Sequence, residues 1–580
     1  MTALDQRGRQ DRVDPFTWSP APRREYLVAA AVAVAVVGFY VAIAAVHGAL
    51  GASRNDDWAY FRIVTHLADT GEFRLDGWVQ TMFIGQALVS LPVIALFGER
   101  ILPLQLLVAV FAAVGLWATY AVIRPWLGRR WTVLAVGCVA VGPVYGIVSV
   151  SYMSDVPSYA LQMLTLLAGV RAMRATPVHL GWLAAALALG FVSFSIREYG
   201  VASGVTVAVY AVVHAWAGRQ RVRTVTALAA TWLASVAALY LWRSGLPNTY
   251  PTPIDLSPTG LRNAADELWR SALTVGLFIA PAAFVVSPLR LLRAARERMT
   301  RRVKVALLVL GVALFATVDV RGLGLVGNHA DRRVAYWRTL PGEPARVLPG
   351  PVWIVLLLIG IYSTAVSVVM VSLRVEVWLR HRRTWRTVLA STADRGAHLS
   401  WLFVVLYAAL LAAAVGLTTT DLFDRYLLVL VPLSAALVVH AGHAERLVRE
   451  LPGRRDAVAM VGLATLGLVV VDGSATFDGA KWRLGEEVAA RTGWEPGSID
   501  AGYEWFGYHQ SSDLELQSEV TGPVFWRALF APRPICASGS FAPSDPTEEP
   551  GGTVVATVTG TGLFGVDVRL VAVAGPDTCP

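Results

Sequence analysis

Charged side chains are scarce in this 580-residue chain. Asp, Glu, Lys and Arg make up 16% of it, whereas an ordinary soluble protein carries roughly 25%. Hydrophobic residues make up 55%, and the mean hydropathy is +0.53. A chain this apolar lacks the polar side chains needed to cover its own surface, which excludes an ordinary soluble globular protein. We therefore expect a polytopic integral membrane protein whose surface is solvated by lipid.

Cysteine and the common cofactor motifs are also scarce. The chain has three cysteines. Cys138 lies inside an apolar run and is expected to be inert. Cys536 and Cys579 lie in the polar C-terminal tail, where they predict a disulfide if the tail is exported and no bond if it is cytoplasmic. A Walker loop, a dinucleotide-binding glycine pattern, a CxxC pair and zinc-type histidine spacing are all missing from the sequence.

Lysine is nearly absent too, because only Lys304 and Lys481 occur among the 50 basic residues. The formal net charge of +9 could suggest a nucleic-acid partner. However, the arginines gather in short segments between apolar runs, which is the topology pattern of a membrane protein. We therefore expect no nucleic-acid partner.

Fourteen apolar runs are candidates for membrane-spanning helices, since a span needs roughly 20 mostly apolar residues. They are 26–47, 79–97, 101–123, 131–150, 157–173, 180–196, 200–217, 224–242, 269–289, 303–320, 351–373, 399–417, 425–441 and 456–472. Run 79–97 is the weakest, because it contains Gln80, Gln86 and Pro92. We interpret it as a juxtamembrane or re-entrant helix, which leaves about thirteen crossings.

This choice also gives the expected charge asymmetry. With the arginine-rich N-terminus inside and 79–97 not crossing, the inner segments hold 23 basic residues and the outer segments hold 10, in agreement with the positive-inside tendency. The outer arginines could be retained by an anionic ligand or by pairing with Asp331 or Glu343. The prediction is a multi-pass protein of the cytoplasmic membrane, with its C-terminus outside.

Three regions follow from this topology. Residues 1–25 form a cytoplasmic N-terminal segment, and 26–472 form the transmembrane domain, with a first outer loop at 48–100. Residues 473–580 form a small mixed α/β extracytoplasmic region. Within it, 478–492 has helical composition, 553–559 and 563–573 predict a hairpin, and 540–552 predicts a loop.

The first outer segment contains two adjacent carboxylates, Asp56 and Asp57. Residues 58–68 have the spacing of an amphipathic helix on the membrane surface. One alternative is that Asn55 or Asp56 merely caps that helix. A cap needs only one such residue, so the pair favours a functional site.

Three further outer segments carry charge at helix ends. Asp155 follows Ser154, which could instead be a helix cap. Arg197 is followed by Glu198, and this pair could be a snorkelling arginine with its partner or a cation for a phosphate. Arg425 stands at another outer helix end, where Tyr426 could serve only as an interface anchor.

Together, these segments resemble the integral-membrane glycosyltransferases of the GT-C fold, in the branch of protein O-mannosyltransferases and lipid A aminoarabinose transferases. The resemblance runs in order from about 26 to 441. It rests on four segments: Asp56-Asp57-Trp58-Ala59-Tyr60, similar to an Asp-Glu-x-x-Tyr pattern; Ser154-Asp155-Val156-Pro157, similar to a second acidic site; Arg197; and Asp424-Arg425-Tyr426-Leu427-Leu428 before Pro432. The family's basic residue with paired prolines in the first loop has no clear counterpart here.

The resemblance implies transfer of a sugar from a polyprenyl-phosphate donor, on the outer face of the membrane, to a protein, polysaccharide or lipid acceptor. It implies Asp56 as the general base, with Asp57 orienting the acceptor or assisting. The substrate-binding residues would be Asp155, Arg197, Glu198, Arg425 and Tyr60, with the two arginines on the phosphate. No cofactor is expected, although two carboxylates in one cavity could hold a divalent metal.

Two other functions remain open from the sequence. One is a transporter or a flippase for lipid-linked sugars, since charges within the membrane mark transport paths. The other is a non-catalytic assembly protein with the tail as its binding module. Carboxylates that converge in an outer cavity would favour the enzyme, whereas carboxylates along a path across the bilayer would favour a carrier.

Overall fold

The computed structural model describes most of the chain, except for short stretches between elements and the N-terminal segment. The described residues are 22–174, 177–247, 249, 254–317, 324–329, 340–342, 344, 347–380, 395–417, 422–448, 453–510, 524–530, 533–542, 552–564, 567–575 and 579. Asp331 and Glu343, the predicted partners of the outer arginines, lie outside these residues, as does most of the predicted loop 540–552.

Helices dominate the structure. They are α1 (Arg23–Val46), α2 (Asp57–Thr70), α3 (Ile84–Phe97), α4 (Ile101–Ile123), α5 (Arg129–Ala140), α6 (Pro143–Val148), α7 (Asp155–Arg174), α8 (Leu180–Ile196), α9 (Val201–Gly218), α10 (Val222–Ser244), α11 (Pro258–Phe278), α12 (Ala280–Ala283), α13 (Pro288–Arg298), α14 (Arg301–Thr317), α15 (Gly350–Arg380), α17 (Arg395–Leu417), α18 (Leu430–Ala444), α19 (Arg454–Thr492) and α20 (Tyr503–Tyr508).

Within the described ranges, seven helices are long and apolar enough to cross a membrane: α1, α4, α9 with the turn before it, α10, α15, α17 and α19. Shorter apolar helices are α3, α8 and α18. The protein is thus a multi-pass membrane protein, and the predicted fold class of a helical membrane domain with a small mixed C-terminal region is confirmed.

Several predicted runs differ from the helices that form. The run 269–289 is not one helix but falls across α11, α12 and the first residues of α13. The run 131–150 was expected to be one helix, but it is divided into α5 and α6. The division falls at Gly142 and Pro143, because proline lacks the N–H that would continue α5 and is well accommodated in the first turn of α6. The run 79–97 contains α3, whose 14 residues span about 21 Å. This is shorter than the roughly 30 Å hydrocarbon core.

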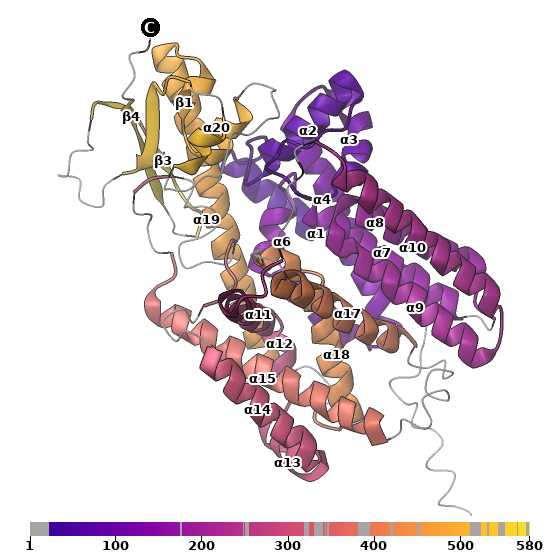
Figure 1. Ribbon diagram of the computed structural model, residues 1–580. Coiled ribbons are helices and arrows are strands. Elements are labelled where there is room, and N and C mark those ends of the chain that lie inside the picture. The colour runs from indigo at the N-terminus through magenta and orange to yellow at the C-terminus, as the bar shows by residue number, and fades with distance from the viewer. Residues whose placement is uncertain are drawn as a thin grey trace, which may run out of the picture.

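Helix α19 joins the membrane domain to the tail. The sequence predicted separate helices over 456–472 and 478–492, whereas the structure has one helix of 39 residues. No proline interrupts this segment, so nothing forces the backbone out of the helix after the apolar part ends. Figure 1 shows α19 running from the helical domain to the C-terminal sheet.

The tail contains a four-stranded sheet in the order β1-β2-β4-β3. Its strands are β1 (Ile499–Asp500), β2 (Ala537–Phe541), β3 (Val554–Gly560) and β4 (Val568–Ala574). β1 pairs parallel to β2, and β3 and β4 form the predicted antiparallel hairpin. A disulfide joins Cys536 to Cys579, with Cα atoms 5.7 Å apart. It ties the end of the chain to the start of β2.

The tail also packs on the first loop, residues 48–100, at the end of the molecule where α2 and α3 lie (Figure 1). A β-carbon on Gly507 of α20 would lie 2.5 Å from the Trp58 ring, so the two segments pack without intervening side-chain volume. Trp58 is fully buried, and its ring centroid lies 5.5 Å from those of Tyr503 and Phe530. Burial of this aromatic surface fixes the tail against the loop.

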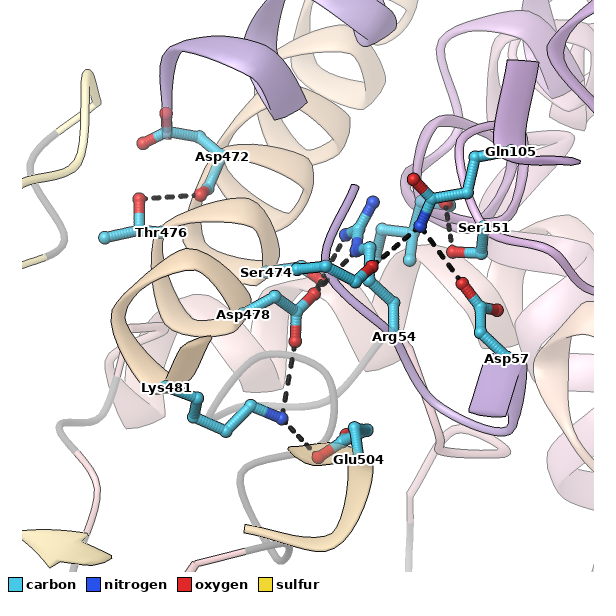
Figure 2. A network of polar contacts seen from close by, with 12 residues as sticks. Arg54, Asp57, Gln105, Ser151, Asp472, Ser474, Thr476, Asp478, Lys481 and Glu504 are labelled. Atoms are coloured by element: carbon cyan, nitrogen blue, oxygen red, sulfur yellow. Dashed lines mark hydrogen bonds and ion pairs between the residues drawn. The ribbon is translucent and has the colours of Figure 1, made fainter. Parts of the chain in front are cut away.

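Buried ion pairs reinforce the same contact (Figure 2). Arg54 of the first loop pairs with Asp478 of α19 through its Nε, at 2.7 Å, and donates to Ser474 at 3.1 Å. Lys481, one turn along the helix, pairs with Asp478 and with Glu504. Buried charges are tolerated only when paired and hydrogen-bonded. Correct docking of loop, helix and tail therefore brings these opposite charges together.

Gly479 offers a test of this packing. A β-carbon there would overlap the backbone carbonyl oxygen of His47, so Gly479→Ala should force the loop away from α19. We expect a loss of about 1–3 kcal/mol, as for other overpacked sites, measured as a lower melting temperature in detergent.

Gly462→Ala on the same helix is the matched control, because the added methyl meets nothing within 4 Å. It should be neutral or stabilising by up to about 1 kcal/mol. Equal melting temperatures for the two variants would contradict the close packing of α19 on the His47 backbone.

Candidate functional site

Asp56 immediately precedes α2, but it does not act as a helix cap. Its side chain makes no capping hydrogen bond. Instead, Oδ1 accepts from Trp78 Nε1 at 2.8 Å and from the Tyr503 hydroxyl at 2.9 Å. The side chain is 18% exposed. The capping alternative is therefore wrong for Asp56, whose carboxylate is held at an open edge of the outer loop.

The other oxygen of Asp56 faces Arg425. Arg425 Nη2 lies 3.5 Å from Asp56 Oδ2, and Arg425 Nε lies 3.6 Å from Asp155 Oδ2. One guanidinium thus joins two carboxylates that are far apart in the sequence. Arg425 comes from the 3₁₀ turn η6 (Asp424–Leu427), which precedes α18. The turn is anchored by Asp424, which accepts from the His329 backbone N–H at 2.8 Å.

Arg197 approaches Asp155 from the other side. Its Nη1 donates to Ser154 Oγ at 2.6 Å and lies 3.4 Å from Asp155 Oδ2. The Tyr426 ring lies beside both cations, 4.6 Å from the Arg197 guanidinium and 5.3 Å from that of Arg425. Asp56, Asp155, Arg197 and Arg425 therefore form a cluster with two charges of each sign. We call these four residues the charge cluster.

A small polar cavity, with room for about one water molecule, lies next to the charge cluster. It is lined by Asp155, Ser158, Tyr159, Gln162, Arg197, Tyr199, Tyr407, Arg425, Tyr426, Leu428 and Val429. Two of the N–H groups at this cavity, Arg197 Nε and Arg425 Nη1, have no hydrogen-bond partner within the described part of the chain. Buried N–H groups of this kind favour an acceptor-rich anion, and a guanidinium suits a phosphate.

Asp57 does not line this cavity, and its carboxyl group points toward Gln105 (Figure 2). It is fully buried, and its Oδ2 accepts from Gln105 Nε2 at 3.2 Å. Burial raises the pKa of Asp57 to about 8. The carboxyl is thus mainly neutral at pH 7. Successive residues in a helix point roughly 100° apart, which explains why adjacent aspartates face different surroundings.

Tyr60 and Glu198 lie near the charge cluster but do not line the cavity. Tyr60 is buried, its hydroxyl is 3.3 Å from Ser154 Oγ, and its ring is 4.6 Å from that of Phe83. Glu198 is half-buried in the 3₁₀ turn η2 (Glu198–Gly200). The ion pair that Arg197 makes is with Asp155, so Arg197 is not simply the surface partner of Glu198.

Trp78 and Tyr503 are the residues that sequence reasoning missed. Each donates a hydrogen bond to Asp56, and Tyr503 does so across a separation of 447 residues. Tyr503 belongs to the segment Ile499–Trp505, to which the sequence assigned no role, and no local signal connects this segment with the first loop. Such pairs are visible only once the tail is docked.

Comparison with known families bears on the middle of the chain. Residues 86–242 match the family model described as dolichyl-phosphate-mannose-protein mannosyltransferase. The matched segment includes Asp155 and Arg197 and covers about a quarter of the chain. A search of curated proteins gave no match. The resemblance to integral-membrane glycosyltransferases is thus confirmed by a family model over this segment.

Three solved structures align with most of the chain. ArnT from Cupriavidus metallidurans, in the apo state and bound to undecaprenyl phosphate, is 16% and 15% identical with TM-scores of 0.39 and 0.38. Each alignment covers 94% of this chain and 99% of the other. The oligosaccharyltransferase AglB from Archaeoglobus fulgidus, in complex with an inhibitory peptide and a dolichol-phosphate, is 11% identical with a TM-score of 0.37, over 85% of this chain and 61% of the other.

The neutral form of Asp57 predicts a pH-dependent stability. An aspartate in the unfolded chain ionises near pH 4, while Asp57 in the folded protein keeps its proton to about pH 8. Between these pH values the folded state binds more protons than the unfolded state. The contribution of Asp57 to the free energy of unfolding is therefore fully present below pH 4 and is lost as the pH rises toward 8. The loss is up to about 1.4 kcal/mol per pH unit.

Asp57→Asn removes this titration. The melting temperature of Asp57→Asn minus that of wild type should therefore increase between pH 4.5 and pH 8.5. Glu72→Gln, an exposed change just beyond the same helix, should follow wild type throughout. A constant difference between Asp57→Asn and wild type across this range would rule out a buried neutral carboxyl.

Proposed function

We propose that this protein is a glycosyltransferase that moves a sugar from a polyprenyl-phosphate donor to an acceptor hydroxyl on the outer face of the cytoplasmic membrane. The observation that carries the proposal is the bridge by Arg425 between Asp56 and Asp155 at the edge of a polar cavity. It places a carboxylate with an available oxygen beside a cationic site suited to phosphate. The family match over 86–242 supports a lipid-phosphate sugar donor.

The phosphate of the donor would bind beside Arg197 and Arg425, where the small cavity would widen to admit it. The acceptor oxygen attacks the anomeric carbon while the bond from that carbon to the phosphate oxygen breaks. The electron pair of the breaking bond leaves with the polyprenyl phosphate, which changes from a singly charged diester to a doubly charged monoester. Two buried guanidinium groups stabilise the added negative charge in surroundings that water screens poorly.

Asp56 would accept the proton of the acceptor hydroxyl. Its Oδ1 is already bound by Trp78 and Tyr503, so Oδ2 is the oxygen directed toward the cation and the cavity edge. As the acceptor loses its proton, Asp56 becomes neutral and its pairing with Arg425 weakens. Arg425 is then left to the phosphate, whose charge increases in the same step.

Asp155 would hold the two arginines in place, since it lies within 3.6 Å of both. Tyr60 would support this arrangement through Ser154, which also accepts from Arg197. Glu198 would set the turn that presents Arg197. Asp57 would fix the first loop from inside rather than meet substrate, because it is fully buried.

The outer location fits the tail as well. The Cys536–Cys579 disulfide is stable in an oxidising compartment and not in a reducing cytoplasm. Since the tail packs directly on the loop that carries Asp56, the tail and the charge cluster must lie on the same side of the membrane.

Asp56→Asn tests the base. The amide oxygen can still accept from Trp78 and Tyr503, so the fold should be retained, but the amide cannot take up a proton. Transfer of radiolabelled sugar from a polyprenyl-phosphate donor in membranes should fall about 100-fold or more, the usual contribution of a general base.

Asp69→Asn, an exposed aspartate on α2, is the matched control and should transfer at the wild-type rate. Full activity in Asp56→Asn would move the base elsewhere. If wild type transfers from none of several donors, the transferase proposal fails and a carrier for lipid-linked sugars becomes the better hypothesis.

We further propose that transfer needs no resident metal. Asp56 and Asp155 both face guanidinium groups, whose charge opposes the binding of a divalent cation between them. Within the described ranges, no group of three or more His, Cys, Asp or Glu side chains is placed to hold a metal ion.

Treatment of the membranes with EDTA should accordingly leave the initial transfer rate within about twofold of the untreated value, as expected when arginines replace a metal in stabilising phosphate charge. A loss that Mg²⁺ or Mn²⁺ restores would show that a metal is required and would overturn this part of the proposal.

A further inference from the structure

The tail supplies a residue to the site formed by the membrane domain. Tyr503 stands at the start of α20, and its hydroxyl donates to Asp56 Oδ1 at 2.9 Å. Trp78 donates to the same atom at 2.8 Å. Both donors therefore act on one oxygen of the carboxylate, and the other oxygen faces Arg425 at 3.5 Å. This arrangement fixes which carboxylate oxygen is available.

The Tyr503 ring is held rigidly, which makes its hydroxyl position well defined. The ring is 4% exposed and lies among Trp58, Trp78 and Phe525, with centroid distances of 5.5, 5.4 and 5.9 Å. Aromatic contacts of this geometry add stability beyond the area that they bury. The hydroxyl is therefore directed at Asp56 by packing rather than by the hydrogen bond alone.

The backbone before Tyr503 is fixed as well. Gly502 has a φ of +107°, a conformation that other residues rarely adopt, and its N–H donates to Asp500 Oδ1 at 3.0 Å. Asp500 also accepts from Trp526 Nε1 at 2.9 Å and from Arg527 Nε. On the other side of Tyr503, Glu504 pairs with Lys481 of α19 (Figure 2). The tail thus holds Tyr503 from both directions.

We propose that Tyr503, together with Trp78, is a positioning residue for Asp56, so that the C-terminal region completes the active site rather than forming a separate binding module. The inference rests on the proposed function for the identity of the reaction. The two donors hold the carboxylate so that Oδ2 receives the proton of the acceptor hydroxyl. They also stabilise the ionised form in which the carboxylate acts as a base.

Tyr503 can fill this role across the working pH range. Burial raises the pKa of Tyr503 well above its usual range, so its hydroxyl remains protonated and remains a donor. A donor that does not titrate gives a constant effect on Asp56 between pH 5 and pH 9.

Tyr503→Phe is the decisive variant, because it removes the hydroxyl and keeps the ring in its aromatic cluster. A hydrogen bond to a charged group contributes enough to predict a drop in kcat of about 10-fold or more. The KM for the donor should stay within about twofold, since Tyr503 is not among the residues that line the cavity. The acidic side of the pH–activity profile should move to higher pH, because ionised Asp56 has lost a donor.

Tyr508→Phe is the matched control on the same helix. Its ring stacks on Phe61 with centroids 5.3 Å apart, and the change leaves that stacking intact. It should keep the wild-type kcat and pH profile. Melting temperatures of both variants should lie close to that of wild type.

A second measurement does not depend on activity. Water-soluble carbodiimides modify protonated carboxyl groups, and mass spectrometry can follow labelling of the peptide that contains Asp56. In Tyr503→Phe, labelling of Asp56 should extend to higher pH than in wild type, whereas Tyr508→Phe should match wild type.

The outcomes separate the two proposals. If wild type transfers sugar and Tyr503→Phe shows the same kcat, pH profile and labelling, the positioning role is wrong and the transferase stands. A parallel fall in kcat and melting temperature with unchanged pH profile and labelling would likewise overturn it, in favour of a structural role. If no donor supports transfer by wild type but the labelling shifts, the contact with Asp56 is supported and the transferase proposal fails.

Discussion

The rest of the site depends on the contact that Arg425 makes with both Asp56 and Asp155. A guanidinium that is 6% exposed is costly to bury unless carboxylates compensate its charge. Asp155 in turn lies against a second cation, Arg197. Removal of one member leaves the others uncompensated, so four segments from different parts of the chain must meet for the cluster to be stable. The two arginines can still bind an anion in the neighbouring cavity, because neither has all its N–H groups hydrogen-bonded within the described part of the chain.

The tail is part of this arrangement. Helix α19 continues from the membrane domain into the tail without a break, and Arg54, Asp478, Lys481 and Glu504 form a buried chain of ion pairs from the first loop to α20. These contacts place the tail at the position where Tyr503 meets Asp56. A flexible tether could not hold the Tyr503 hydroxyl within hydrogen-bond distance of one carboxylate oxygen. A continuous helix that is joined to the first loop and to α20 by buried ion pairs can do so.

The adjacent residues Asp56 and Asp57 show how different surroundings give two chemically identical carboxyl groups different roles. Asp56 is partly exposed, accepts hydrogen bonds from Trp78 and Tyr503, and faces the Arg425 guanidinium. Asp57 is enclosed beside Gln105, and burial favours its neutral form. One carboxyl is thus suited to receive a proton and the other to stabilise the loop. A neutral side chain in the interior also avoids adding a third negative charge near the two carboxylates of the charge cluster.

The sequence by itself determined the membrane class and the hairpin of β3 and β4, because hydropathy, alternation and turn residues act over a few neighbouring positions. It left the pairing of Cys536 with Cys579 conditional on the compartment of the tail. It also indicated that Asp56, Asp155, Arg197 and Arg425 stand at ends of apolar runs. Tertiary structure alone decided that Asp56 rather than Asp57 faces Arg425, and that Tyr503 reaches across 447 residues to the first loop. The break of 131–150 at Gly142 and Pro143 is local, and the sequence prediction overlooked it. The physical reason is that local pattern fixes which element forms and which face is apolar, whereas the rotation of each element and its partners are set by packing and by the need to pair buried charge.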